Sequence, residues 1–257
     1  MNPTKKQLRV FATSDLHGHL EGLDPIGFDL VLIAGDIVPA QFFVDKRQWL
    51  IESFVPWVKS YPQAQFVVIP GNHDMFARSE RSLLDGVDNL HFLIDESVEL
   101  YGLKIYGTPW VPPIDGHWAF EGKDEENLRM KFAAIPQGVD ILLTHTPPRI
   151  KGKKIDVSLQ YRNGSRPFGS VALTEAVKTK HPHLIICGHI HTGDHADTLI
   201  GLPKDVNYHT LVFNVSRIDE HYEIAYPPRT LTITERSFII DPLNEPEIVT
   251  GDHKIVP

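Results

Sequence analysis

Short apolar runs recur along the chain, and each gives way at once to polar residues. The runs lie at residues 8–13, 28–34, 66–69, 139–143 and 184–187. Their brevity and their β-branched and aromatic side chains predict buried strands. Because Asp, Asn or His follows each run, the pattern places chemically versatile side chains at the ends of five strands.

Between the second and third runs the chain changes to a helical period. Apolar residues from Asp45 to Tyr61 recur at a spacing that predicts one apolar stripe on a helix. Pro56 falls off that stripe and is expected to kink or shorten the helix. A strand–helix–strand unit of this length predicts parallel strands. Since ligands bind beyond the carboxyl ends of strands in such sheets, the polar strand ends are expected to form one site.

The middle of the chain has a different pattern. Three short runs, at 91–94, 98–101 and 104–107, predict antiparallel hairpins and therefore a mixed sheet. The other expected elements are two helices, at Asp124–Ala134 and Gly169–Lys180, and a strand at Thr230–Ile240.

Two segments have no sustained period. Residues 146–168 follow His145 directly and predict a long loop that borders the site. Residues 241–257 form a polar tail that is expected to attach only loosely. No repeat or linker divides the chain, so a single domain over residues 1–257 is predicted, with a core at about 8–240.

Composition limits the class of protein. With 25 basic and 33 acidic residues, the 257-residue chain has a formal charge of −8 and no basic stripe for duplex nucleic acid. The apolar runs are shorter than the roughly 20 residues of a membrane-spanning helix, so no membrane insertion is expected. No apolar leader precedes Asp15, and Cys187 is the only cysteine. A cytoplasmic protein without disulfides is therefore expected, with its oligomeric state left open.

The polar strand ends contain a candidate set of metal ligands. It comprises two carboxylates, one amide and four imidazoles: Asp15, His17, Asp36, Asn72, His145, His189 and His191. These donors are sufficient for two divalent ions that share a carboxylate, as in two-metal hydrolases of phosphate esters. Mixed nitrogen and oxygen donors suit Mn, Fe, Zn, Ni or Co rather than Ca, and Mn is favoured here.

Five motifs occur in the order found in the calcineurin-like metallophosphoesterases. They are Asp15-x-His17, Gly35-Asp36, Gly71-Asn72-His73-Asp74, Thr144-His145 and Gly188-His189-x-His191. The chain resembles that superfamily from Leu8 to Phe213. The resemblance implies an α/β fold in which two packed mixed β-sheets are flanked by helices, the αββα sandwich.

The resemblance also implies a role for each residue. One metal would be held by Asp15, His17, Asp36 and His191, and the other by Asp36, Asn72, His145 and His189. A hydroxide bridging the metals would be the nucleophile. His73 would face the substrate phosphate and protonate the leaving oxygen, while Asp74 would orient His73.

Longer phrases resemble the metallophosphoesterase-domain (MPPED-type) phosphodiesterase branch. These are GTPW at 107–110, THTPP at 144–148 and GHIHTG at 188–193. The likeness favours a phosphodiesterase for a small diester such as a cyclic nucleotide. Some members of the branch lack the first histidine of the last motif and are inactive, so His189 favours an active enzyme. A phosphomonoesterase or nucleotidase would use the same ligands, and a non-catalytic scaffold of the same fold is a further alternative.

Other residues are candidates for binding the substrate, besides Asn72 and His73. His19 could touch the substrate or a metal, or be satisfied within a turn. Trp110 could stack on a nucleobase or anchor its loop in the core. Arg149 begins a basic cluster that could meet phosphate or remain solvated.

Overall fold

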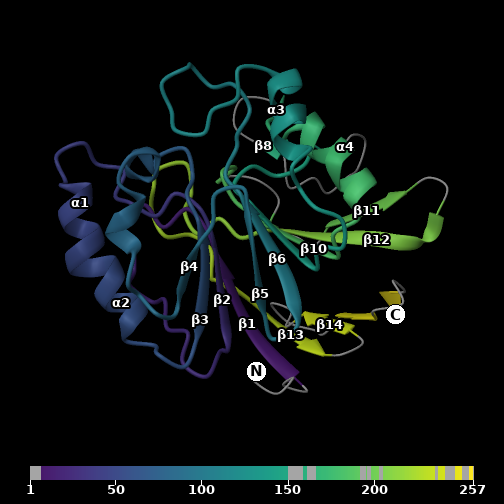
Figure 1. Ribbon diagram of the computed structural model, residues 1–257, viewed down its shortest axis with the longest axis horizontal. Helices are drawn as coiled ribbons and strands as arrows, with labels where there is room; N and C mark the ends of the chain where they lie inside the picture. The colour runs from purple at the N-terminus through teal and green to yellow at the C-terminus, as the bar shows by residue number, and fades with distance from the viewer. Residues whose placement is uncertain are drawn as a thin grey trace.

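Two β-sheets pack against each other between two groups of helices (Figure 1). The computed structural model describes residues 7–149, 159–160, 166–191, 195, 198–202, 205–234, 237–240, 247–250 and 255–256. The first sheet has the spatial order β16 (Ile255–Val256), β15 (Glu247–Thr250), β14 (Ser237–Ile240), β13 (Arg229–Thr234), β1 (Gln7–Thr13), β2 (Leu30–Ala34), β3 (Gln65–Ile69) and β4 (Leu90–Phe92). The second has the order β11 (Thr198–Leu202), β12 (Asp205–Asn214), β10 (Leu184–Cys187), β7 (Ile141–Thr144), β6 (Leu103–Thr108) and β5 (Glu96–Leu100).

Each sheet has a parallel centre and antiparallel edges. Strands β1 to β4 are parallel to their neighbours among themselves, and so are β6, β7, β10 and β12. Strands β13, β5 and β11 join the sheets antiparallel. The predicted αββα arrangement of two mixed sheets is therefore confirmed. Its parallel strands β2, β7 and β10 are buried throughout, which explains their unbroken apolar runs.

Three apolar clusters hold the layers together. One lies between the sheets and includes Val10, Leu32 and Ile186. A second packs the other face of the first sheet against the helix before β3. The third packs the second sheet against α3 (Glu125–Phe132) and α4 (Val171–Lys180). All side chains in these clusters are removed from water, the main favourable term in folding.

The helix predicted at 45–61 is present at 46–59. It consists of α1 (Lys46–Trp49), a π-helical turn η1 (Leu50–Phe54) and α2 (Val55–Lys59). The Asp45 side chain caps its start by accepting from the Gln48 amide at 3.0 Å. Pro56 neither shortens nor ends the helix: the chain widens into the π-turn directly before it, where a missing amide hydrogen is tolerated.

Three pairing predictions differ from the structure. Strand β4 lies parallel to β3 in the first sheet, and only β5 and β6 form the expected antiparallel hairpin. Asp95, between β4 and β5, has a left-handed backbone with φ 56°, so the chain turns there from one sheet to the other. The strand expected at 230–240 is a hairpin of β13 and β14. The tail expected to be loose contributes β15 and β16 to the first sheet.

The remaining elements are short. Two single-turn 3₁₀ helices, η2 (Met75–Arg78) and η3 (Arg81–Leu84), follow β3. Of the predicted loop at 146–168, residues 150–158 and 161–165 lie outside the described residues, while β8 (Leu159–Gln160) pairs with β9 (Arg166–Pro167). Among the described residues, the helices fall short of the length and apolarity required to cross a bilayer.

Candidate metal centre

The carboxyl ends of the parallel strands of both sheets meet at one edge of the sandwich. Asp15 follows β1 and Asp36 follows β2, both in the first sheet. His145 follows β7 and His189 follows β10, both in the second. Hydrogen bonds join these turns, since Gly188 donates its amide to the His145 carbonyl and His189 donates its amide to the Asp15 carboxylate. Two sheets thus contribute side chains to one cluster.

One half of the cluster is centred on Asp36 and His145. The Nε2 atom of His145 lies 3.3 Å from Asp36 Oδ2 and 3.1 Å from Asn72 Oδ1. The other ring nitrogen, Nδ1, lies 2.7 Å from the Ala34 carbonyl oxygen. A carbonyl oxygen only accepts hydrogen bonds, so Nδ1 must carry a proton. The other ring nitrogen, Nε2, faces the side-chain oxygens of Asp36 and Asn72. His189 completes this half, with its ring centroid 5.0 Å from that of His145.

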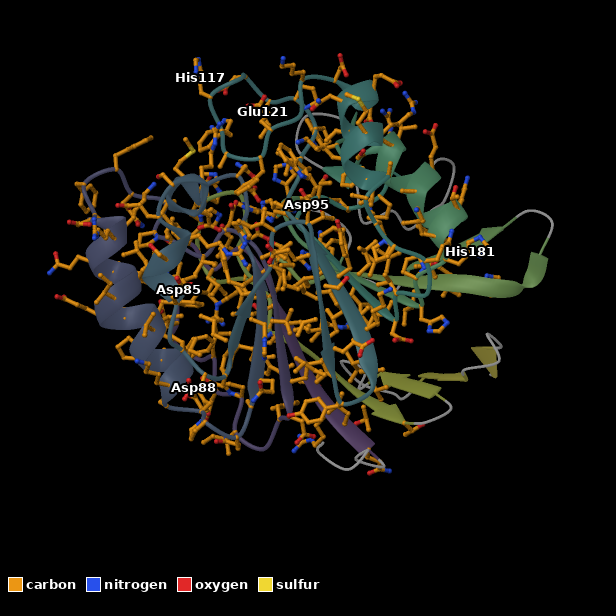
Figure 2. All side chains as sticks on the ribbon, viewed as in Figure 1. Asp85, Asp88, Asp95, His117, Glu121 and His181 are labelled. Carbon is orange, nitrogen blue, oxygen red and sulfur yellow. The ribbon has the colours of Figure 1, made fainter. Side chains whose placement is uncertain are left out.

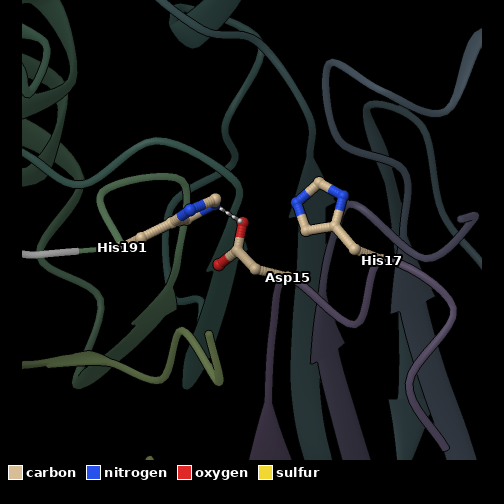
Figure 3. A group of neighbouring side chains, drawn as sticks. All are labelled: Asp15, His17 and His191. Carbon is tan, nitrogen blue, oxygen red and sulfur yellow. Dashed lines mark ion pairs between the residues drawn. The ribbon is translucent and has the colours of Figure 1, made fainter. Parts of the chain in front are cut away.

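The other half is built from Asp15, His17 and His191 (Figure 3). His191 Nε2 is 3.5 Å from Asp15 Oδ1, and His191 Nδ1 donates to the Asp219 carbonyl at 3.2 Å. His191 is thereby oriented in the same way as His145, by a backbone carbonyl behind the ring. His17 lies on the opposite side of Asp15, with Nε2 3.6 Å from Asp36 Oδ2.

The donor set fits divalent metal ions. In the groups Asp15–His17–His191 and Asp15–Asp36–His145, one ligand atom from each residue lies within 4.8 Å of the others. The His17 ring is 1% exposed, yet neither of its nitrogens has a hydrogen-bond partner among the described residues. A buried polar atom without a partner is unfavourable by about 1–3 kcal/mol. A cation between these carboxylates and imidazoles would supply the missing partner.

The turns that carry the ligands have unusual backbones. Asp15, His17, Asp36 and His189 all adopt positive φ, between 42° and 69°. Non-glycine residues adopt this region rarely and at some energetic cost, which is common at functional sites. The adjoining glycines allow close approach: a Cβ at Gly71 would overlap the Asp36 carboxylate, and one at Gly188 would overlap Ser14 and Asp15.

Electrostatics keep the carboxylates charged and two imidazoles neutral. Burial disfavours charge on Asp36, but the neighbouring histidines outweigh it and hold its pKa well below the usual value. Burial lowers the pKa of His17 and of His189 to about 3. Burial opposes charge on His145 as well, but the Asp36 and Asp15 carboxylates raise its pKa to about 9. The anionic Asp36 carboxylate and the neutral imidazoles of His17 and His189 are therefore in the protonation states that bind metals.

His73 lies at the edge of this cluster. Its amide donates to Asp36 Oδ1 at 2.8 Å, and its ring centroid is 4.7 Å from that of His17. One ligand atom each of His17, Asp36 and His73 also lies within 4.8 Å of the others. The ring is only partly buried, so it faces both the cluster and the space above it.

The hydrogen bonds of the Asp74 carboxylate differ from the predicted contact with the His73 ring. Its carboxylate is fully buried and accepts the amides of Ile37 at 3.0 Å, Val38 at 3.0 Å and Gly71 at 2.8 Å. It therefore points back into the two turns after β2 and β3 rather than at the His73 imidazole. Backbone amides in those tight turns need an acceptor, and Asp74 supplies it. Burial, followed by the charge of Asp36, raises the pKa of Asp74 to about 7.

Two aromatic residues at the site were not among the predicted site residues. Trp118 packs on His73 with ring centroids 4.4 Å apart. Tyr222 lies edge-on to His17 at 4.9 Å and to His191 at 5.4 Å. The aromatic sequence around Trp118 offered a weak signal, whereas Tyr222 sits in an irregular segment after Ser216 that has no recognisable pattern.

A cavity of about 390 Å³ opens over the cluster. Its floor includes Asp36, Asn72, His73, His189 and His191, and its walls include Ile114, Trp118, Phe168, Glu220 and Tyr222. Ligand sites of this size are typically apolar with a few convergent polar groups. The metal-ligand cluster is thus accessible to a small molecule.

The wall that carries Trp118 is a loop built around one carboxylate. Glu121 accepts the amides of Gly116 at 2.8 Å and Trp118 at 3.2 Å, and also that of Ile114. Figure 2 shows Glu121 in the loop that projects beside α3. The Ala119 amide donates to the Asn72 carbonyl at 3.1 Å, which ties this loop to the metal-ligand turn.

Three predicted substrate contacts lie outside that cavity's lining. His19 pairs with Glu21 at 2.8 Å in a turn. Trp110 donates its indole N–H to Asp95 at 2.8 Å and packs on Phe120, so it anchors its loop in the core. The Arg149 amide donates to the Ser170 carbonyl at the start of α4. The rest of its basic cluster, at 151–154, lies outside the described residues.

Comparison with known proteins places the chain in a family. The model of the calcineurin-like phosphoesterase family matches residues 8–193. A UPF0046 protein of Caenorhabditis elegans is 39% identical over 126 residues, which are 49% of this chain and 30% of that protein's length. Human metallophosphoesterase domain-containing protein 1 is 27% identical over 245 residues, covering 86% of this chain and 69% of the human one. The crystal structure of the Thermus thermophilus protein TT1561 is similar in fold, with a TM-score of 0.57 at 16% identity, covering 82% and 89% of the two chains. This chain therefore belongs to the calcineurin-like phosphoesterase family, with a metallophosphoesterase fold and candidate clusters of metal ligands.

Proposed function

We propose that the protein is a two-metal phosphodiesterase that acts on a small diester such as a cyclic nucleotide. The observation that carries the proposal is the convergence of seven donor residues below an open cavity, with buried His17 lacking any hydrogen-bond partner among the described residues. Membership of the calcineurin-like phosphoesterase family supports the same class of reaction.

We assign one ion to each half of the cluster. Asp15, His17, Asp36 and His191 would bind one metal, and Asp36, Asn72, His145 and His189 would bind the other. When bound, a pair of divalent ions would polarise the phosphate and lower the pKa of a water. The mixed donors suit Mn, Fe, Zn, Ni or Co, and we favour Mn.

His73 is proposed to protonate the leaving oxygen. Its partly buried imidazole lines the cavity beside the cluster, and the hydrogen bond from its backbone amide to Asp36 holds the backbone beneath the ring. Trp118 packs on the ring and limits its rotation. A positioned imidazole that transfers a proton in the transition state typically contributes about 10²–10⁴-fold.

The lining of the cavity favours a diester over a monoester. Among its described lining residues there is no Lys or Arg, whereas Glu220 adds a negative charge and Ile114, Trp118 and Phe168 add apolar surface. A monoester dianion would bring one more negative charge beside Glu220, with no cation in this lining to offset it, while a diester carries a single charge and a second ester substituent. A phosphomonoesterase or nucleotidase is the second candidate, because it would use the same ligands.

The experiment is hydrolysis of matched aryl phosphate mono- and diesters by protein stripped of metal and then supplied with Mn²⁺. Diester cleavage is expected only with metal, and His73→Ala should reduce kcat by about 10²-fold or more. His19→Ala is the matched control and should retain activity, since His19 lies in a turn outside the cavity.

Two results would contradict the proposal in different ways. Much faster cleavage of the monoester would replace the diesterase with a monoesterase. Absence of turnover of either ester, with two metals measured on the protein, would favour the non-catalytic scaffold.

A further inference from the structure

A second cavity, of about 400 Å³, adjoins the one over the metal-ligand cluster. We call it the side cavity. His73, Trp118 and Tyr222 line both cavities, so these three residues form the boundary between them. The other wall of the side cavity consists of Ala40, Gln41, Phe42 and Lys46, in the loop before α1 and at its first residue. The mechanism proposed above gives these four residues no role.

The loop before α1 exposes apolar surface that folding does not use. Phe42 is 95% exposed and Phe43 is 89% exposed. Large exposed apolar side chains in neighbouring positions often mark a binding surface. Of these two residues, Phe42 lines the side cavity and Phe43 does not. A ligand in the side cavity can therefore contact the Phe42 ring but not the Phe43 ring.

The chemistry of the side cavity fits a flat heterocycle. Phe42, Trp118 and Tyr222 provide aromatic faces on which any of the nucleobases can stack. Gln41 and Lys46 provide hydrogen-bonding groups at the same cavity. A nucleobase has both an aromatic face and an edge of hydrogen-bond acceptors, whereas a simple aliphatic alcohol has neither.

The position of His73 connects this cavity to the reaction. If His73 protonates the leaving oxygen, the alcohol that leaves must lie on its side of the phosphate. His73 also lines the side cavity, so an alcohol that leaves beside the His73 ring has access to that space. We infer that the side cavity binds the nucleobase of a nucleotide substrate, with Phe42 and Trp118 as stacking residues and Lys46 at the base edge. This inference rests on the proposed function, which it deepens by naming the residues that would recognise the base.

The test compares two ligands that differ only in the base. Calorimetric titration of Mn²⁺-loaded protein with adenosine 5′-monophosphate and with ribose 5-phosphate measures the contribution of the base without requiring turnover. The nucleotide is expected to bind about tenfold more tightly or better, given the usual strength of base stacking. Phe42→Ala should abolish that ratio and leave the affinity for ribose 5-phosphate unchanged. Phe43→Ala is the control and should keep the ratio.

A second variant tests the base edge. Lys46→Met should weaken the nucleotide and spare ribose 5-phosphate. An equal loss for both ligands would place Lys46 at the phosphate and overturn its assignment to the base edge.

The outcomes distinguish a failure of the nucleobase site from a failure of the proposed phosphoesterase function. If ribose 5-phosphate binds but the base adds nothing, or if Phe42→Ala retains the full ratio, the nucleobase site is wrong and the phosphoesterase stands. If neither ribose 5-phosphate nor inorganic phosphate binds the metal-loaded protein, the phosphoesterase proposal fails, and the nucleobase site fails with it.

Discussion

The Nδ1–H of His145 donates to the carbonyl oxygen of Ala34 at 2.7 Å, across the space between the two sheets. Ala34 ends β2 and His145 follows β7, so one hydrogen bond links the edges of both sheets and orients a ligand. A backbone carbonyl behind a histidine fixes which ring nitrogen is free for a metal. His191 repeats this arrangement with the Asp219 carbonyl.

His145→Ala is expected to remove one of two bound metals. Its Nε2 faces Asp36 and Asn72, and these two residues alone would leave the second ion with few ligands. Metal analysis after dialysis should fall from about two ions per chain towards one. His91→Ala is a suitable control, because His91 pairs with Gln65 away from the site. Unchanged stoichiometry would show that His145 is not a ligand.

Gly71→Ala is expected to abolish metal binding and activity. An added Cβ would overlap the Asp36 carboxylate and approach the Asp36 amide nitrogen to 2.5 Å, so the proposed bridging ligand must move. Gly86→Ala tests ordinary glycine replacement: its φ is 74° and the space around it is open, so a loss of about 1–2 kcal/mol in stability with normal metal binding is expected. Equal behaviour of both variants would argue against close packing at Gly71.

Asp74→Asn distinguishes the observed contacts from the orientation of His73 that the sequence predicted. An amide side chain has only one oxygen acceptor, so part of the network with Ile37, Val38 and Gly71 is lost. The free energy of unfolding should fall by about 1–3 kcal/mol in urea denaturation. A variant with reduced kcat and undiminished stability would instead support a direct role on His73.

Trp118→Leu should affect catalysis, whereas Trp110→Leu should affect stability. Trp118 packs on His73 at the cavity, so its replacement should raise KM or lower kcat with little change in stability. Trp110 donates to Asp95 and packs among buried residues, so its replacement should reduce stability by about 2–4 kcal/mol. Thermal unfolding and steady-state kinetics on both variants test the difference. A destabilised but kinetically normal Trp118→Leu would reverse this assignment.

The loop that carries Trp118 should loosen at acidic pH. The amides of Ile114, Gly116 and Trp118 outweigh the effect of desolvation and lower the pKa of Glu121 below 4.5. Since the folded-state pKa is the lower one, the stabilisation is present above pH 4.5 and is lost as the pH falls through the folded pKa. The Gly116 amide resonance in NMR spectra should titrate with a midpoint below 4.5, and this titration should vanish in Glu121→Gln. A midpoint at or above 4.5 would contradict the role of this carboxylate.

Local sequence determined the central strands and the identity of the candidate ligands. The buried parallel strands needed apolar side chains on both faces, so β2, β7 and β10 appeared as continuous apolar runs. Their polar ends followed because a parallel sheet gathers its carboxyl ends at one edge. The helices also follow from local sequence, because a residue that can cap a helix stands at the start of each: Asp45, Asp124 and Ser170.

Only the tertiary structure decided which polar side chains contact the site. Asp74, adjacent to His73 in sequence, turns away because three buried amides from two turns require an acceptor. Trp110 and Trp118 have similar local sequence signals, but Asp95 draws the first into the core while Glu121 holds the second beside His73. Tyr222 reaches the cluster from a segment more than 180 residues after Asp36, through a left-handed turn with φ 64°. These contacts form because the packing of two sheets brings together buried polar groups that need hydrogen-bond partners. No local sequence pattern encodes which groups will meet.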